Sequence, residues 1–380
     1  MSLGVSVNIL SHSHLQAPES SHDAAMANDP FTALQTPVPS ISTRQASALL
    51  REHYGIDATL EPLSSERDQN FMAETTDGEK YVLKFANSSE PSAVTDLQIQ
   101  SLLHIARIAP DIPVPRVIPT DDGKLMFEVE SVAGDAHRVR LLSWLDGVPV
   151  QRVQVGRAVA RQIGACLAQI GRALRDFEHP AGDYALLWDI RNVASLEKLL
   201  PCVNDMDLRK LCESRVGRFR DVIAPQLDSL RSQVIHNDMN PGNVLVDHAD
   251  ANRVTGVIDF GDIVFSRLVN DVAVAGAYFC RIEDDPFAEV VEFLDAYTDV
   301  LPLTEEEIAV LPDLILSRHL TTVMISHWRA GLYPDNAEYI LRSEGRARKM
   351  LYLVNGMSIN DTVGRFLDVC GRAPGQESGA

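Results

Sequence analysis

Cysteine is scarce in this chain of 380 residues, and the few copies follow no metal-binding or disulfide pattern. They are odd in number, widely scattered and free of C-x-x-C spacing, at Cys166, Cys202, Cys212, Cys280 and Cys370. This distribution argues against a disulfide framework and against a zinc site. A reducing environment suits such a chain best, so we expect a cytoplasmic protein.

Positive charge is also in short supply. The chain has 34 Lys and Arg residues against 53 Asp and Glu residues, which gives a formal net charge of -19. Nucleic acids and anionic membranes attract proteins through positive potential, so we expect neither as a partner. The negative field favours a small cationic substrate instead.

Long apolar runs are missing as well. No stretch approaches the roughly 18 consecutive apolar residues that indicate a membrane-spanning helix. The first residues lack the basic region and apolar core of a secretion signal. The sequence therefore predicts neither membrane insertion nor secretion.

What the chain does have is enough apolar sequence, 45% of its residues, to bury a sizeable core. Residues 1–40 show no sustained periodicity, and we expect a flexible N-terminal extension there. We divide the remainder into an N-terminal lobe with a connector, 41–146, and a mainly helical C-terminal lobe, 147–380.

The N-terminal lobe is expected to contain a small antiparallel sheet. A helix is predicted from Ser42 to a terminating Gly55, and a second one from about 89 to 108. Short alternating runs predict strands at 58–63, 70–75, 80–85, 114–118, 125–129 and 139–145. These elements indicate a sheet with one long helix behind it.

The C-terminal lobe is predicted to be helical, with one β-rich interruption. Apolar periodicity indicates helices near 151–176, 192–228, 269–300, 305–330 and 336–356. Residues 234–262 instead alternate short apolar runs with polar turns. Together these patterns predict an α+β protein of two lobes with a cleft between them.

The strongest chemical signal lies in that β-rich interruption. It reads His-Asn-Asp-Met-Asn-Pro-Gly-Asn over 236–243 and Val-Ile-Asp-Phe-Gly-Asp over 257–262. Phosphoryl transfer needs a carboxylate beside the attacking hydroxyl and oxygen ligands for a metal ion. The spacing assigns the catalytic carboxylate to Asp238 and the metal ligands to Asn243 and Asp259. We expect His236 to fix the loop by packing, and the alternative is that all these polar residues only shape turns.

These motifs resemble the aminoglycoside phosphotransferase and choline kinase superfamily, over about residues 42–348. That resemblance implies a protein-kinase-like fold, with a nucleotide-binding lobe before the connector and a catalytic and substrate lobe after it. The segments at 65–71, 81–85 and 187–189 look most like the hydroxylysine kinase branch. The cofactors implied are Mg²⁺, with Mn²⁺ as the alternative, and ATP or GTP as phosphate donor.

The resemblance also assigns roles in the N-terminal lobe. Lys84 is expected to contact the nucleotide phosphates. The loop at 64–70 would cover them through Ser64 and Ser65, although it lacks a glycine-rich pattern. Related kinases place a glutamate opposite the lysine, where this chain has Gln98, with Asp96 as an alternative partner.

The segment at 141–147 looks like the connector whose backbone recognises the nucleotide base. We assign this recognition to Ser143 and Leu145, and we expect Trp144 to pack in the core.

The resemblance implies an acceptor hydroxyl on a small, amine-bearing molecule. Asp189 and Asp262 are the candidate ammonium-binding residues, and Asp271 is a further candidate with a structural alternative. The leading acceptor is 5-hydroxylysine, and aminoglycosides, homoserine, choline and ethanolamine remain alternatives. A nucleotide-binding pseudokinase or regulatory module is the alternative from another class, which only Gln98 favours. We expect a monomer or a homodimer.

Overall fold

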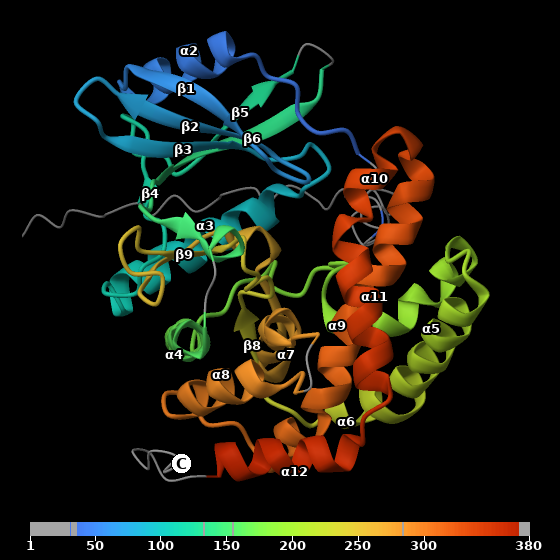
Figure 1. The fold of residues 1–380 in the computed structure, drawn as a ribbon. Coiled ribbons are helices and arrows are strands. Elements are labelled where there is room, and N and C mark those ends of the chain that lie inside the picture. Colours follow the sequence, from blue (N-terminus) through green and yellow to red (C-terminus); the bar gives the residue numbers. More distant parts are fainter. Residues whose placement is uncertain (1–30, 32–35, 132–133, 154–155, 283–284, 372–380) are drawn as a thin grey trace, which may run out of the picture.

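The computed structural model describes residues 31, 36–131, 134–153, 156–282 and 285–371. These residues form a sheet-containing lobe and a larger helical lobe, which are drawn one above the other in Figure 1. The prediction of a two-lobed α+β protein is confirmed. Most of the predicted extension at 1–40, namely 1–30 and 32–35, lies outside the described residues.

The sheet lobe begins with helix α2 (Thr43–Tyr54). Ser42 and Gln45 form a reciprocal capping box at its start, and Gly55 ends it with a left-handed φ of 63°. The predicted helix and both of its end signals are confirmed.

The sheet is antiparallel throughout and has the strand order β1-β2-β3-β6-β4, with β5 also pairing with β6. The strands are β1 (Ala58–Leu63), β2 (Gln69–Thr75), β3 (Lys80–Phe85), β4 (Val117–Ile118), β5 (Phe127–Glu130) and β6 (Ala136–Ser143). All six predicted strands are present. The last one starts and ends earlier than the predicted 139–145, because the chain leaves the sheet after Ser143 to enter the connector.

Two separate cores stabilise the lobes. The sheet lobe packs α2 on one face of the sheet around Phe71, Leu83 and Phe85. Helix α3 (Ser92–Ile108) contributes Leu97 and Leu102 to the larger core of the helical lobe. The helix behind the sheet is therefore anchored to the other lobe, which fixes how the lobes meet.

The connector runs into the helical lobe through Gly147. Its φ is 150°, and a Cβ there would lie 2.5 Å from Thr255 Oγ1. Only glycine allows this approach. The chain then forms β7 (Val148–Pro149), which pairs with β9 (Val244–Val246) and so joins the connector to the β-rich interruption.

That interruption consists of two small antiparallel sheets, β10-β9-β7 and β11-β8. Its other elements are β8 (Ser232–Ile235), β10 (Val254–Val257), the 3-10 turn η5 (Phe260–Asp262) and β11 (Val264–Arg267). The two predicted motifs lie directly between these strands, so short buried strands hold both ends of each motif.

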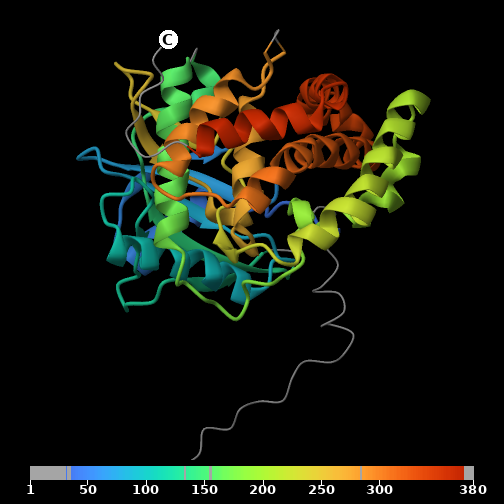
Figure 2. The same ribbon diagram turned by 90° about the horizontal axis from the view of Figure 1, so that it is seen from below.

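Helices make up the rest of the larger lobe, and Figure 2 shows α4 at one margin and α5 at the other. They are η2 (Val150–Arg152), α4 (Arg157–Ala173), η3 (Ile190–Cys202), α5 (Met206–Arg218), η4 (Phe219–Ile223), α6 (Ala224–Leu227), α7 (Leu268–Phe279), α8 (Ala288–Thr298), α9 (Glu305–Leu332), η6 (Pro334–Asn336), α10 (Ala337–Ile340), α11 (Arg342–Asn355) and α12 (Ile359–Cys370).

Three predicted boundaries in this lobe were wrong. The region 192–228 is not one helix: η3 is a 3-10 helix containing Pro201, and Asp205 caps a new helix. The region 269–300 divides between α7 and α8. Helix α12, which Ser358 caps, lies beyond the last predicted helix. Pro201 and the capping residues Asp205 and Ser358 mark helix boundaries that apolar periodicity alone does not show.

Helix α9 is, among the described residues, the one helix long and apolar enough by composition to cross a membrane. However, 89% of its apolar window is buried inside the protein. This burial is typical of a core helix, and α9 indeed packs against α7 and α11.

Candidate active site

The loop at 236–243 is held by a carboxylate beneath it. Asp271 of α7 accepts hydrogen bonds from the backbone N–H groups of His236, at 3.3 Å, and Asn237, at 2.8 Å. Asp271 is 1% exposed, and burial raises its pKa to about 7. It therefore positions the loop, which is the structural role that its place at the helix start favoured over acceptor binding.

His236 fixes the same loop from within. Its Nδ1 accepts from the N–H of Asp238 at 3.2 Å, and its Nε2 lies 3.3 Å from the carbonyl oxygen of Ile258. The ring packs edge-on against Phe260, and burial lowers its pKa. A neutral ring with one donor and one acceptor fits these contacts, as expected for the structural role.

Asp238 is held by three donors. Its Oδ2 accepts from Asn240 Nδ2 at 2.9 Å and Asn243 Nδ2 at 2.8 Å, and its Oδ1 accepts from Arg318 at 3.3 Å. Burial and the nearby Asp262 raise its pKa to about 7, although Arg318 opposes this shift. An oriented carboxylate with a near-neutral pKa suits proton acceptance from a hydroxyl.

Asp259 has an uncommon backbone conformation at the end of β10. Among the described residues, Asn237 and Asp259 are the non-glycine residues with positive φ, at 62° and 63°. The Asp259 carboxylate accepts from Gly261 N at 3.2 Å and from Lys84 Nζ at 3.3 Å. Lys84 lowers its pKa to about 2, so this carboxylate is ionised. Strained residues of this kind often mark functional sites.

Asn243 and Asp259 offer oxygen ligands to one cavity. The Asn243 amide nitrogen is engaged by Asp238, so its amide oxygen is the atom left for a cation. No cluster of three or more His, Cys, Asp or Glu ligands occurs in the described part of the chain. Mg²⁺ needs no such cluster, because protein sites often supply one or two oxygen ligands and the phosphates supply others. The donor set therefore fits Mg²⁺.

Lys84 lies in the middle of the sheet, opposite Asn70 of β2 and Arg140 of β6. Its side chain is largely buried, and its ammonium contacts Asp259 at 3.3 Å and Asp68 at 3.9 Å. This geometry directs its charge into the cleft between the lobes.

The suggested partners of Lys84 were wrong. Gln98 donates to Glu90 and to the Gly261 carbonyl, and it accepts from Arg140. Asp96 pairs with His179, at 3.2 Å. An uncharged amide is better matched to this mixed set of donors and acceptors than to a lone ammonium. The carboxylates that do reach Lys84 come from the loop before β2 and from the end of β10.

A cavity of about 580 Å³ lies between the lobes at the connector. The predicted residues that line it are Ser64, Lys84, Gln98, Ser143, Leu145, Asn243 and Asp259. Ser65 is exposed and does not line it. The hydroxyl of Ser143 accepts from the backbone N–H of Arg116, and the backbone N–H of Ser143 donates to the Arg116 carbonyl oxygen.

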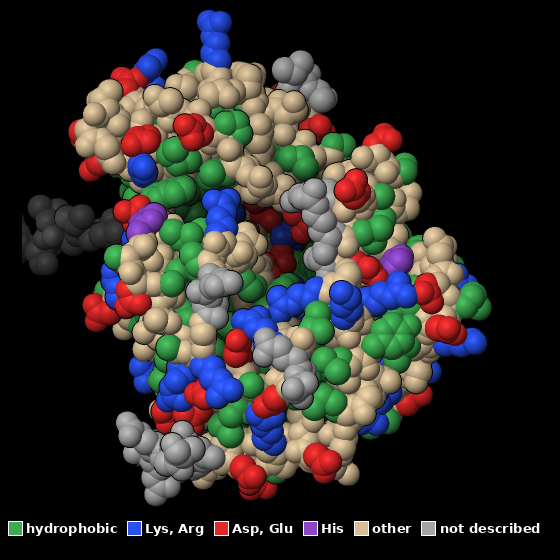
Figure 3. Space-filling model, in the orientation of Figure 1, with side chains coloured by type: hydrophobic (Ala, Val, Ile, Leu, Met, Phe, Trp, Pro, Cys, Tyr) green, Lys and Arg blue, Asp and Glu red, His purple; other side chains and the backbone are tan. Residues whose placement is uncertain are grey.

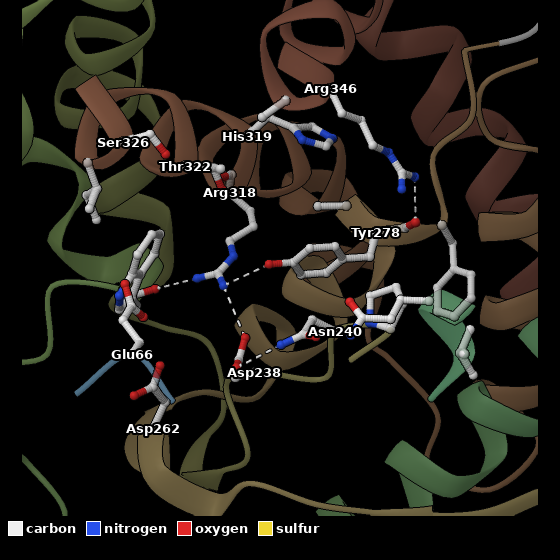
Figure 4. A pocket seen from close by; sticks show the side chains of 18 of the residues that line it. Glu66, Asp238, Asn240, Asp262, Tyr278, Arg318, His319, Thr322, Ser326 and Arg346 are labelled. Carbon is white, nitrogen blue, oxygen red and sulfur yellow. Dashed lines mark hydrogen bonds and ion pairs between the residues drawn. The ribbon is translucent and has the colours of Figure 1, made fainter. Parts of the chain in front are cut away.

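A second cavity, of about 930 Å³, adjoins the first, and Asn240 and Gln151 line both. Asp238 faces this second cavity (Figure 4). Its charged lining is balanced and not acidic, with Glu66, Asp238, Asp262, Glu289, Arg281, Arg318, Arg329 and Arg346. Figure 3 shows acidic and basic side chains together at the hollow between the lobes.

The two predicted ammonium ligands differ in their placement. Asp262 lines the second cavity and pairs with Arg67. Asp189 is 1% exposed, caps η3 and is engaged by Arg191 and Ser266. It does not line this cavity, so the structure does not bring it together with Asp262. A capping aspartate beside an arginine has its charge already satisfied.

Two residues of the loop before β2 cross to the helical lobe, and the sequence motifs did not indicate them. Arg67 pairs with Asp262, and Glu66 pairs with Arg329 of α9. The two contacts join residues that are 195 and 263 positions apart in the sequence, so no local sequence pattern predicts them. They hold the loop over the junction of the cavities.

Arg318 of α9 was also missed. It is 4% exposed, contacts Asp238, and donates to the Trp188 carbonyl at 3.0 Å and to the Tyr278 hydroxyl at 3.3 Å. Its guanidinium lies near the rings of Trp188 and Tyr278, with centroids at 5.1 and 5.8 Å. Arg318 is thus fixed on several sides while it orients the catalytic carboxylate.

Arg318→Met should lower kcat by about 10-fold or more, because a hydrogen bond to a charged group contributes about 1.5–3 kcal/mol. Arg318 lowers the pKa of Asp238, so its removal should also move the acidic limb of the pH–rate profile to higher pH. Steady-state rates across the pH range check both effects. Arg172→Met, at an exposed residue of α4, is the control. An unshifted limb would contradict the proposed coupling.

Comparison with known proteins agrees with this geometry. The model of the phosphotransferase enzyme family, APH, matches residues 59–305. Hydroxylysine kinase of Mus musculus is 28% identical over 324 residues, covering 80% of this chain and 86% of that protein. Homoserine kinase of Methylobacillus flagellatus is 28% identical over 244 residues, covering 63% of this chain and 70% of that protein.

A solved structure shares the fold. An amicoumacin kinase in complex with AMP-PNP and Ca²⁺ superimposes with a TM-score of 0.66 at 15% identity, covering 84% of this chain and 97% of that one. The predicted protein-kinase-like architecture is confirmed. The chain belongs to the phosphotransferase enzyme family and is a small-molecule kinase that acts on hydroxyl groups.

Proposed function

We propose that this protein transfers the γ-phosphate of ATP or GTP to the hydroxyl of 5-hydroxylysine, with Mg²⁺, or alternatively Mn²⁺, as the metal. The observation that carries this proposal is the hydrogen bond between Asp238 and Asn243, at 2.8 Å. Asp238 lines the larger cavity, whereas Asn243 lines the smaller one together with Lys84 and Asp259. The bond therefore joins an acceptor site to a phosphate-donor site.

Each residue has a role that follows from its contacts. Asp238 accepts a hydrogen bond from the acceptor hydroxyl and takes up its proton as the phosphate transfers. Asn243 and Asp259 would hold the metal, and Lys84 would contact the phosphates beside Asp259. The bound metal neutralises charge on the phosphates. Ser143 and Leu145 present the connector backbone to the base.

The amino-acid relatives favour 5-hydroxylysine over the other acceptors. Four curated hydroxylysine kinases are 25–28% identical over at least 80% of this chain. Homoserine is the second candidate, because homoserine kinases also match. Asp262 and Glu66 place carboxylates on one side of the cavity, and an ammonium group would share them with their ion-pair partners Arg67 and Arg329. Choline, ethanolamine and aminoglycosides rank below these two as candidate acceptors.

Other properties complete the proposal. The lobe at 41–146 binds the nucleotide, and the lobe at 147–380 binds the acceptor. The protein acts in the cytoplasm as a monomer or homodimer, with neither nucleic acid nor membrane as partner. A pseudokinase is the weaker proposal. Gln98, which does not contact Lys84, was the one feature that favoured it, but Lys84 still forms an ion pair with the carboxylate of Asp259.

The test is an acceptor panel. The purified protein is incubated with Mg²⁺ and ATP or GTP, and with hydroxylysine, homoserine, choline, ethanolamine or an aminoglycoside. Mass spectrometry identifies the phosphorylated products, and Asp238→Ala is the inactive control. We expect phosphohydroxylysine from the wild type alone. Preferential phosphorylation of another acceptor would contradict 5-hydroxylysine as the proposed substrate. Nucleotide binding without any product would favour the pseudokinase.

A further inference from the structure

The larger cavity contains a guanidinium that forms no ion pair with a carboxylate in the described part of the chain. Three of its four arginines form ion pairs: Arg281 with Glu289, Arg318 with Asp238, and Arg329 with Glu66. Arg346 forms no ion pair with any described residue. Its Nη2 donates to the carbonyl oxygens of Tyr278 and Cys280, both at 2.8 Å. Five N–H donors on a guanidinium leave others for an anion.

A second unsatisfied group lies beside it. His319 of α9 lines the same cavity, is 6% exposed, and its Nε2 has no hydrogen-bond partner among the described residues. Burial, followed by the charges of Arg346 and Arg318, lowers its pKa to about 3, so the ring is neutral. A buried polar atom without a partner costs about 1–3 kcal/mol, which a ligand oxygen accepting from a ring N–H would offset.

These groups lie apart from Asp262 and Glu66, whereas Glu289, the acidic residue on their side of the cavity, is paired with Arg281. In Figure 4, Arg346 and His319 are on one side of Asp238, and Asp262 and Glu66 are on the other. Arg346 belongs to α11 and His319 to α9, two helices that pack together. The cavity therefore has an anion-accepting end, and Asp238 lies between that end and the ion-paired carboxylates of Asp262 and Glu66.

We propose that Arg346 and His319 bind the α-carboxylate of the acceptor, an inference that rests on the proposed phosphorylation of a free hydroxy amino acid. A guanidinium matches a carboxylate through two parallel hydrogen bonds. The acceptor hydroxyl then lies at Asp238, and an ammonium group near it lies toward Asp262. The preferred substrates are zwitterionic hydroxy amino acids, and the corresponding amines without a carboxylate are poor acceptors.

The experiment compares 5-hydroxylysine with the diamine in which hydrogen replaces its carboxylate. Arg346→Met should raise KM for 5-hydroxylysine by about 10- to 100-fold, as expected for loss of a charge-assisted hydrogen bond. It should leave kcat/KM for the diamine nearly unchanged. Arg346→Lys should restore part of the loss, and His319→Phe should raise KM for the amino acid selectively. Arg348→Met is the matched control, because Arg348 lies on the same helix as Arg346 and its removal breaks only an ion pair with Asp205, the residue that caps α5.

Equal effects of Arg346→Met on both acceptors, or no effect on either, would overturn the carboxylate site while leaving the proposed function intact. Binding is measured separately by calorimetry in the presence of ADP and Mg²⁺. If the wild type binds 5-hydroxylysine but does not phosphorylate it, carboxylate-dependent binding that Arg346→Met weakens supports this inference although the proposed function fails. Absence of both binding and turnover would overturn both. Melting temperatures confirm that each variant folds.

Discussion

Asp238→Asn is expected to lower kcat by about 10²- to 10⁴-fold, the usual contribution of a positioned general base. The amide is close in shape to the carboxylate but cannot take up the proton of the acceptor hydroxyl. Asp238 lines the larger cavity and not the smaller one, so nucleotide affinity should stay within a few-fold of the wild type. Single-turnover phosphorylation and calorimetric nucleotide binding measure the two effects separately.

The control for this variant is Asp250→Asn, at an exposed turn before β10. It should retain wild-type rates. Asp238→Ala should match Asp238→Asn in rate, because both remove the base. An Asp238→Asn enzyme with nearly full kcat would show that another group accepts the proton, and a parallel loss of nucleotide affinity would show that the loop itself has been displaced.

Asp259→Asn should lower kcat/KM by about 10²- to 10³-fold, because a metal ion contributes several kcal/mol of charge stabilisation in the transition state. The metal concentration for half-maximal rate should rise as well. Asparagine tolerates the left-handed conformation that this residue has, with φ of 63°, so the substitution tests charge and not backbone strain. Metal titrations of the initial rate measure the shift.

Asp176→Asn, at an exposed residue after α4, is the control for metal dependence and should behave as the wild type. The melting temperature of Asp259→Asn in the absence of ligands should remain close to that of the wild type. An unchanged metal requirement would exclude Asp259 as a ligand. A large fall in melting temperature would instead indicate that its ion pair with Lys84 mainly stabilises the fold.

Local signals account for what the sequence predicted well. The capping pair Ser42 and Gln45, the terminating Gly55 and the alternating strands act within a few residues, so their patterns survive in the sequence. The same is true of Asp238, Asn243 and Asp259, since motif spacing and flanking strands place them together. Their geometry follows from two short segments of chain.

The errors concern where polar side chains point, which contacts within a turn and between distant segments both decide. Gln98 follows Lys84 at the spacing of a partner, but Arg140 and Glu90 satisfy its amide instead. Asp189 adjoins Trp188, which does line the acceptor cavity, yet its own carboxylate points to Arg191. A sequence shows which residues carry charge, whereas their orientation depends on tertiary packing.

The arginines of the acceptor cavity show the same limit. An excess of acidic residues over the whole chain predicted a cation-binding site, but Arg318 and Arg346 come from two C-terminal helices and make the cavity mixed in charge. Net charge describes the surface as a whole, not one cavity. The acceptor therefore has to fit a cavity that presents both positive and negative charges.

The most direct test of the account is a single-turnover reaction of the wild-type protein with γ-labelled ATP, Mg²⁺ and 5-hydroxylysine. The label is followed by mass spectrometry into amino acid, inorganic phosphate and protein. We expect the label to appear as a phosphate ester on the hydroxyl of 5-hydroxylysine, and Asp238→Asn to suppress its appearance. Label that appears only as inorganic phosphate, or an ester that forms equally fast in the variant, would contradict it.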